Sequence, residues 1–180
     1  MEFPVCTFDL KTGVLCPKCE SKITRGELTT LDLDIMRFFV ELEKQYAQLA
    51  HLHYVRSLRI DDHLFVVFKE KDLSGLPQQL LAQLKKSLSE KFGPTVKLIE
   101  EHRDFNMFLQ SLVTPARLIA INKVWLPDQT TEIKAVVEDD RVLKTPLQVL
   151  SDFIKQLTGV SVSFELQRKG RTSAVRFGRW

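Results

Sequence analysis

The chain has 180 residues, of which 44% are hydrophobic and 27% are charged, so we expect a packed core in one ordinary domain or two small ones. Seven glycines and seven prolines argue against a long disordered or fibrous segment, and three cysteines are too few, and odd in number, for a disulfide scaffold. The net charge is only +3, and the absence of a secretory signal pattern or a run of about 18 apolar residues favours a cytoplasmic protein.

The first region, residues 1–30, is expected to be irregular and holds all three cysteines, Cys6, Cys16 and Cys19. The inner CPKC motif has the spacing of a zinc knuckle, in which both thiolates reach one metal ion. The stretch between Cys6 and Cys16 can form a hairpin about the sequence KTG, which would bring the outer cysteine back to the other two. We therefore predict a small cysteine hairpin that binds zinc.

A closed zinc site needs four ligands, and the three cysteines leave one position open. The candidates for that position are a water molecule, a group from a partner, or one of the side chains of Asp9, His51, His53, His63 and His102. Two alternatives to a zinc site remain. The thiols can be free, with CPKC as a plain turn, or CPKC can be a redox dithiol, which is disfavoured because no strand-to-helix pattern surrounds it.

The second region, residues 31–101, has the periodicities of one α-β-β-α-β unit. Apolar residues recur three and four apart from Leu31 to Leu49, as in an amphipathic helix that Thr30 or Asp32 can cap. A turn at Asp61–Asp62 separates two strands. The expected elements are a helix over 31–50, strands over 54–60 and 64–70, a helix over 76–93 and a strand over 95–100.

The third region, residues 102–167, repeats the same order. The expected elements are a helix over 103–113, strands over 116–127 and 131–139, a helix over 146–159 and a strand over 160–166. Two helices on one side of each three-stranded sheet would cover one face and leave the other exposed. The predicted fold class is therefore α+β, with two tandem units that follow the cysteine hairpin.

The stretch TPARLIAINKVWLPDQTTEIKAVVEDD, the helix ending in KQLTG and the strand VSVSFEL resemble the KH domains of archaeal NusA-like proteins. The resemblance covers residues 103–167, and for residues 31–101 it depends on the order of the elements. It implies two KH-like units related to the type II fold. The loops at 69–76 and 138–145 read KEKDLSGL and EDDRVLKT, so both lack the GxxG clamp and the units would be degenerate KH domains.

The resemblance and the charge distribution together predict a non-enzymatic RNA-binding protein associated with RNA polymerase or the ribosome, on nascent transcript or ribosomal RNA. The last region, residues 168–180, supports an RNA partner because it holds five basic residues and no acidic one, whereas residues 1–167 hold 21 basic and 23 acidic residues. Its arginine, lysine and aromatic side chains can pair phosphates and stack on bases. These are Arg168, Lys169, Arg171, Arg176, Phe177, Arg179 and Trp180. The alternative is an ordinary solvated terminus.

Lys123 and Trp125 lie two residues apart on an expected strand and would form a second basic and aromatic contact if both face outward. The alternative for Trp125 is packing at the edge of the sheet. No nucleotide-binding loop, nucleophile elbow or HExxH motif is present, so we predict that the protein is not an enzyme. A second hypothesis is a protein-protein adaptor in which the cysteine knuckle docks on RNA polymerase or the ribosome.

Overall fold

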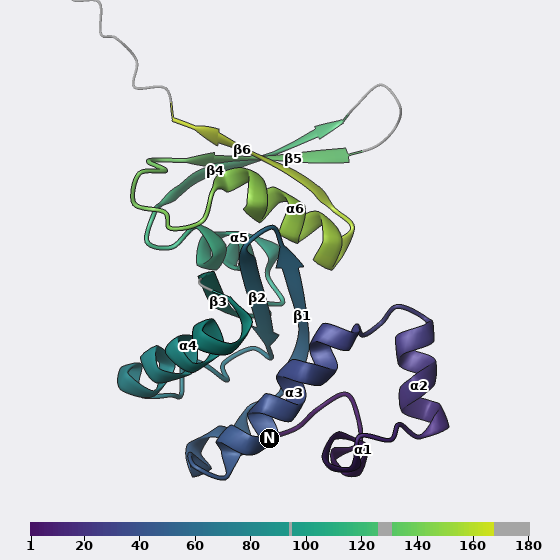
Figure 1. Ribbon diagram of the computed structural model, residues 1–180. Coiled ribbons are helices and arrows are strands. Elements are labelled where there is room, and N and C mark those ends of the chain that lie inside the picture. Colours follow the sequence, from purple (N-terminus) through teal and green to yellow (C-terminus); the bar gives the residue numbers. More distant parts are fainter. Residues whose placement is uncertain (94, 126–130, 168–180) are drawn as a thin grey trace, which may run out of the picture.

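The computed structural model describes residues 1–93, 95–125 and 131–167, and the basic C-terminal segment lies outside these ranges. Figure 1 shows two α-β-β-α-β units that follow two short N-terminal helices. The elements are α1 (Thr7–Thr12), α2 (Pro17–Thr24), α3 (Thr30–Glu43), the 3-10 helix η1 (Ala47–His51), β1 (Tyr54–Ile60), β2 (His63–Phe68), α4 (Gln78–Phe92), β3 (Thr95–Glu100), α5 (Phe105–Val113), β4 (Leu118–Trp125), β5 (Thr131–Val137), α6 (Leu147–Thr158) and β6 (Ser161–Leu166).

The two sheets have the same topology, which confirms the predicted repeat of element order. In the first sheet the strand order is β1-β2-β3, with β1 antiparallel and β3 parallel to the central strand. In the second sheet the order is β4-β5-β6 with the same directions. The predicted turn at Asp61–Asp62 is also confirmed, because Asp61 has a φ of 50° and Ile60 pairs directly with His63.

Helix α3 begins one residue earlier than predicted and ends seven residues earlier. Thr29, rather than Thr30, is the N-cap, and the Asp32 carboxylate completes a capping box with the Thr29 backbone. Asp32 is fully buried and also accepts hydrogen bonds from the Tyr54 hydroxyl at 2.6 Å and the Ser57 backbone N–H at 2.5 Å. The start of α3 is therefore tied to β1. Beyond Glu43 the chain turns into η1, which buries Leu49.

The first sheet is covered on both faces, which contradicts the prediction of an exposed face. On one face, Leu64 and Phe68 pack in a core with α3 and α4. On the other face, Phe65 and Val67 pack in a second core with α5 and α6, and the Phe65 and Phe153 rings stack at 4.3 Å between centroids. A strand buried on both faces reads as an unbroken apolar run, which explains the sequence LFVVF in β2.

The second sheet has the predicted arrangement, with one covered face. Helix α6 packs beneath it, and no helix of the described chain lies on its other face (Figure 1). That open face carries the ion pair between Lys134 and Glu165 at 3.2 Å. None of the helices described here is long and apolar enough to cross a membrane.

Candidate functional site

The three predicted cysteine ligands meet at one point near the N-terminus, together with Asp9. Cys6 precedes α1, Asp9 lies within α1, Cys16 is the N-cap of α2, and Cys19 is in the first turn of α2. Their sulfur and carboxylate oxygen atoms all lie within 4.8 Å of one another. This cysteine-aspartate cluster (Cys6, Asp9, Cys16 and Cys19) can therefore bind one metal ion.

Backbone hydrogen bonds orient two of the candidate ligands. The Cys16 N–H donates to Asp9 Oδ2 at 2.9 Å, and the Cys6 N–H donates to Cys19 Sγ at 3.4 Å. The Cys16 N–H is the main reason that the pKa of Asp9 is lowered, with smaller contributions from the Cys19 and Cys16 thiols. Asp9 is thus held as a carboxylate beside the three sulfur atoms, in spite of its burial.

The buried thiol of Cys19 shows why a cation suits this cluster. Burial raises the pKa of Cys19 to about 12, because a thiolate in an apolar environment loses its hydration. Cys19 is only 3% exposed and belongs to the core around α3. A bound metal ion would compensate the thiolate charge and would release the proton on binding. Three sulfur donors and one oxygen donor are compatible with four-coordinate zinc in a structural role.

Among the side chains considered for the fourth position, Asp9 is the one that the structure places beside the three cysteines in the described part of the chain. In the described part of the chain, no histidine belongs to the cysteine-aspartate cluster. His53 instead contacts Asp72, with 3.1 Å between Nδ1 and Oδ1, while His51, His63 and His102 also lie outside the cluster. The sequence included Asp9 as a candidate, but its spacing from the cysteines could not distinguish it from the histidines.

The predicted cysteine hairpin is wrong, because α1 occupies the stretch between Cys6 and Cys16. Gly13 ends this helix with a φ of 80°, a conformation that glycine adopts without strain, so the KTG sequence is a helix end rather than a hairpin turn. The CPKC motif is also no plain turn, because α2 begins at Pro17 within it. The helices α1 and α2 contradict the expectation that residues 1–30 are irregular, but no strand leads into α2 among the described residues, so the strand-to-helix pattern of a redox dithiol is not present there.

The predicted contact at Lys123 and Trp125 is exposed. Trp125 ends the edge strand β4 and is 71% exposed, so it is not the packing residue that the alternative interpretation required. The Lys123 Nζ atom lies 5.1 Å from the centroid of the Trp125 ring, in cation-π contact. The other predicted RNA contacts lie outside the described residues: Arg168, Lys169, Arg171, Arg176, Phe177, Arg179 and Trp180.

Carboxylates of the protein itself bind backbone N–H groups in both loops where the KH resemblance would place GxxG. In the first loop, the N–H groups of Leu73 and Ser74 donate to Glu100 Oε1 at 2.5 and 2.8 Å. In the second loop, the Arg141 N–H donates to Asp139 Oδ1 at 3.0 Å. These donors are therefore engaged within the protein, which agrees with the missing clamp sequence.

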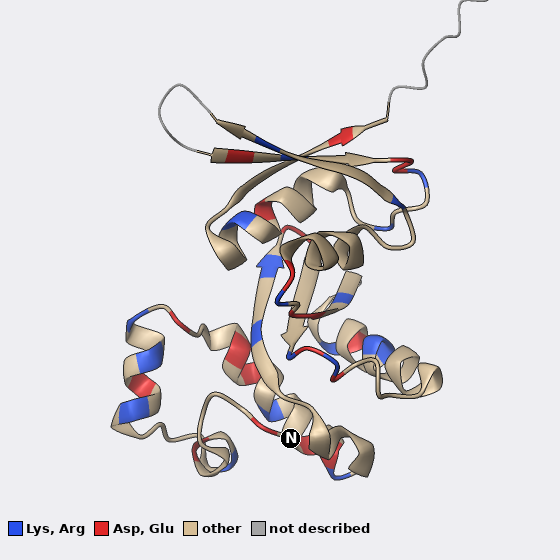
Figure 2. Ribbon diagram, turned by 180° about the vertical axis from the view of Figure 1, so that it is seen from behind, with Lys and Arg blue, Asp and Glu red and all other residues tan. Residues whose placement is uncertain are grey.

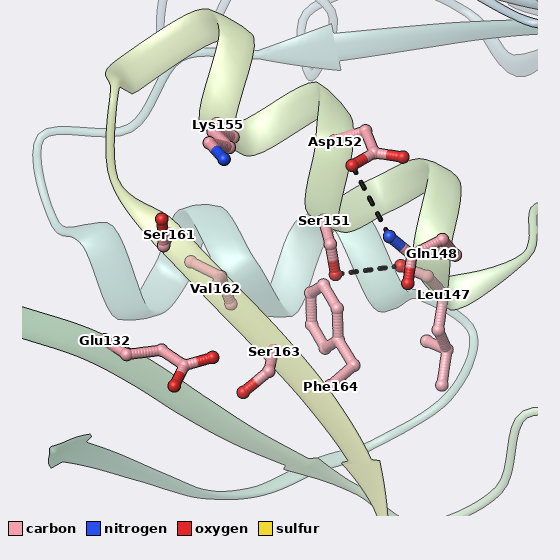
Figure 3. Close-up of a pocket in the computed structure, with 10 residues that line it drawn as sticks. All are labelled: Glu132, Leu147, Gln148, Ser151, Asp152, Lys155, Ser161, Val162, Ser163 and Phe164. Atoms are coloured by element: carbon pink, nitrogen blue, oxygen red, sulfur yellow. Dashed lines mark hydrogen bonds between the residues drawn. The ribbon is translucent and has the colours of Figure 1, made fainter. Parts of the chain in front are cut away.

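A further pocket of about 340 Å³ lies between α6 and the edge strand β6 (Figure 3). Ser151 Oγ donates to the Leu147 carbonyl at 3.2 Å, and Gln148 Nε2 donates to Asp152 Oδ1 at 3.5 Å. These polar groups bond along their own helix rather than converging on one point. The pocket therefore offers no nucleophile paired with a base among the residues that line it.

No protein-family model matches the chain, and no curated protein matches it. Among solved structures, the one described as "Crystal structure of APE1850" is similar with a TM-score of 0.51 and 14% sequence identity. The similarity covers 71% of this chain and 96% of that chain. At this identity the likeness concerns the fold alone.

Proposed function

We propose that the protein is a non-enzymatic RNA-binding protein that associates with a large RNA-containing machine, either the ribosome or RNA polymerase. In this proposal the cysteine-aspartate cluster binds zinc and fixes α1 and α2, while RNA contacts the second unit and the basic C-terminal segment. The observation that carries the proposal is the exposed pair of Lys123 and Trp125 at the end of β4.

An exposed tryptophan beside a lysine suits single-stranded RNA for two reasons. The ring can stack on any base, and base-aromatic stacking contributes about 1–3 kcal/mol per base. The ammonium group can pair a phosphate next to the stacked base, and its cation-π contact favours one orientation of the ring. The pair is presented on an edge strand, where no neighbouring strand of the described chain covers it.

The second sheet separates this pair from the start of the basic C-terminal segment. Trp125 pairs with Thr131 at one end of β5, whereas Val137 at the other end pairs with Leu166, just before the described chain stops at Gln167 (Figure 1). The seven residues of β5 span about 20 Å at the usual rise per residue. We therefore expect affinity to increase with RNA length until one strand reaches both contacts.

The test is RNA binding by Trp125→Ala, Lys123→Gln and a chain lacking residues 168–180, measured by fluorescence anisotropy with single-stranded RNA at two salt concentrations. Trp125→Ala should weaken binding by a factor of about 5 to 150, which corresponds to one lost stacking contact. Lys123→Gln and the truncation should also reduce the salt dependence. Phe8→Ala is the matched control, because Phe8 is equally exposed at 71% on α1. Unchanged affinity of Trp125→Ala would contradict the proposal.

A second candidate function, the protein-protein adaptor, is favoured by one observation. Phe8 and Val14 are 71% and 73% exposed beside the cysteine-aspartate cluster, and large exposed apolar side chains mark contact surfaces when they lie together. Under this hypothesis Phe8→Ala should reduce retention on purified ribosomes or RNA polymerase without changing RNA affinity. Trp125→Ala then serves as its control, so the same two variants separate the two functions.

A further inference from the structure

A pocket of about 590 Å³ lies at the junction of the two units, away from the cysteine-aspartate cluster and from Trp125. Five separate segments form it: β1, the chain after β2, the chain after β3, the start of α5 and the end of α6. Its lining includes three cationic side chains, two carboxylates and a phenylalanine ring, namely Arg56, Lys69, Arg103, Glu70, Glu101 and Phe105.

The sheet topology brings these segments together. Strands β2 and β3 are parallel and their last residues, Phe68 and Glu100, pair directly. The chain therefore leaves both strands at the same edge, where the Glu101 N–H donates to the Phe68 carbonyl at 2.8 Å. Helix α5 then begins at Phe105 and packs on the second face of the sheet. Figure 2 shows acidic and basic segments side by side in this region, between the first sheet and the helices above it.

The cationic side chains of the pocket have no charged partner among the residues that the structure describes. Within the same residues, the buried Nε atom of Arg56 has no hydrogen-bond partner. In the parts of the chain that the structure describes, Arg56, Lys69 and Arg103 form no ion pair, although Glu70 and Glu101 line the same pocket. Three cationic side chains that line one pocket without a charged partner favour a ligand that brings an anionic acceptor.

We infer that this junction pocket binds a nucleoside phosphate. Arg56, Lys69 and Arg103 would pair the phosphate, and the ring of Phe105 would contact the base. The two carboxylates can accept hydrogen bonds from ribose hydroxyl or base amino groups, which inorganic phosphate lacks. The volume lies in the range of small-molecule sites, which often occur between domains.

The inference deepens the proposed function, since the nucleotide can be free or part of an RNA strand.

In the test, the full-length protein is titrated with AMP, CMP, GMP and UMP while the side-chain Nε–H resonance of Arg56 is followed by NMR. Arg56→Gln removes the charge, and Arg25→Gln is the matched control because Arg25 is an exposed arginine that caps the C-terminal end of the distant helix α2. Thermal unfolding of both variants confirms that they retain the fold.

We expect a saturable shift of the Arg56 resonance with at least one nucleotide, and affinity for it about tenfold weaker in Arg56→Gln, as for the loss of one charge-assisted hydrogen bond. Arg25→Gln should bind as the wild type does. The inference is overturned if no nucleotide shifts the resonance at up to about 10 mM, where even a millimolar ligand binds. It is also overturned if Arg56→Gln binds with unchanged affinity.

The source of the nucleotide is distinguished by repeating the titration with single-stranded RNA. Weaker binding of both RNA and the mononucleotide by Arg56→Gln assigns the pocket to an RNA residue. Weaker binding of the mononucleotide alone assigns it to a free nucleotide. If the wild type binds the mononucleotide but no RNA, the proposed function fails and the junction pocket stands.

Discussion

Replacing Cys19 with alanine should destabilise the protein by an amount that depends on metal. Cys19 is 3% exposed, so the substitution removes one buried sulfur atom from the core around α3. If packing alone mattered, the loss would be about 1 kcal/mol, close to that of one buried methylene group. If Cys19 ligates zinc, the loss also includes the stabilisation that zinc gives to the folded state, which is about 4 kcal/mol at a free concentration a thousand times the Kd.

The assay is urea unfolding of the wild type and Cys19→Ala, each with zinc and with a chelator. We expect a difference in unfolding free energy of about 5 kcal/mol with zinc, which falls to about 1 kcal/mol with the chelator. Cobalt gives an independent readout, since thiolate-to-cobalt charge-transfer absorption should appear with the wild type and weaken in Cys19→Ala. A difference of about 1 kcal/mol under both conditions would refute the metal site, because it would show that only packing was lost.

Further predictions concern the scaffold. Phe65→Ala should cost about 4–5 kcal/mol, since it empties a fully buried position and removes the stack on Phe153, and urea unfolding should remain a single transition for both units. Asp32→Ala should cost about 3–5 kcal/mol in the same assay, because it leaves the buried Ser57 N–H without its acceptor and removes the bond from the Tyr54 hydroxyl. Burial lowers the pKa of Lys97 to about 8, so the unfolded chain binds more protons between pH 8 and 10, and unfolding free energy should rise with pH there by on the order of 2 kcal/mol. Lys97→Met should flatten that rise, and an equal rise in the variant would exclude Lys97 as its cause.

The order of helices and strands could be predicted from the sequence because amphipathic periodicity is local. The leucine and phenylalanine stripe of α3 and the alternation in β6 both identify the element and its inner face. The burial of both faces of the first sheet could not be predicted in this way, since the run LFVVF in β2 indicates a strand but not which elements cover each face. Only the packing of α5 and α6 supplies that information.

The candidate sites also contain residues that the sequence predicts and residues that only the fold brings together. Spacing indicated Cys6, Cys16 and Cys19, yet it could not choose Asp9, whose position depends on the helical path of α1. No sequence pattern indicated Arg56 as a binding residue, because the junction pocket is assembled from segments that lie up to about a hundred residues apart. The signal that could have found it is the cluster of charges directly after β2 and β3, once those strands are known to be parallel.

The shared core between the units also bears on how a long ligand would be recognised. With Phe65 and Val67 locked beneath α5 and α6, the first sheet and the second cannot hinge without opening buried apolar surface. The distance between the junction pocket and Trp125 is consequently fixed by the fold. A polymer that contacts both would have to match this distance, so it would be recognised by its length as well as by its chemistry.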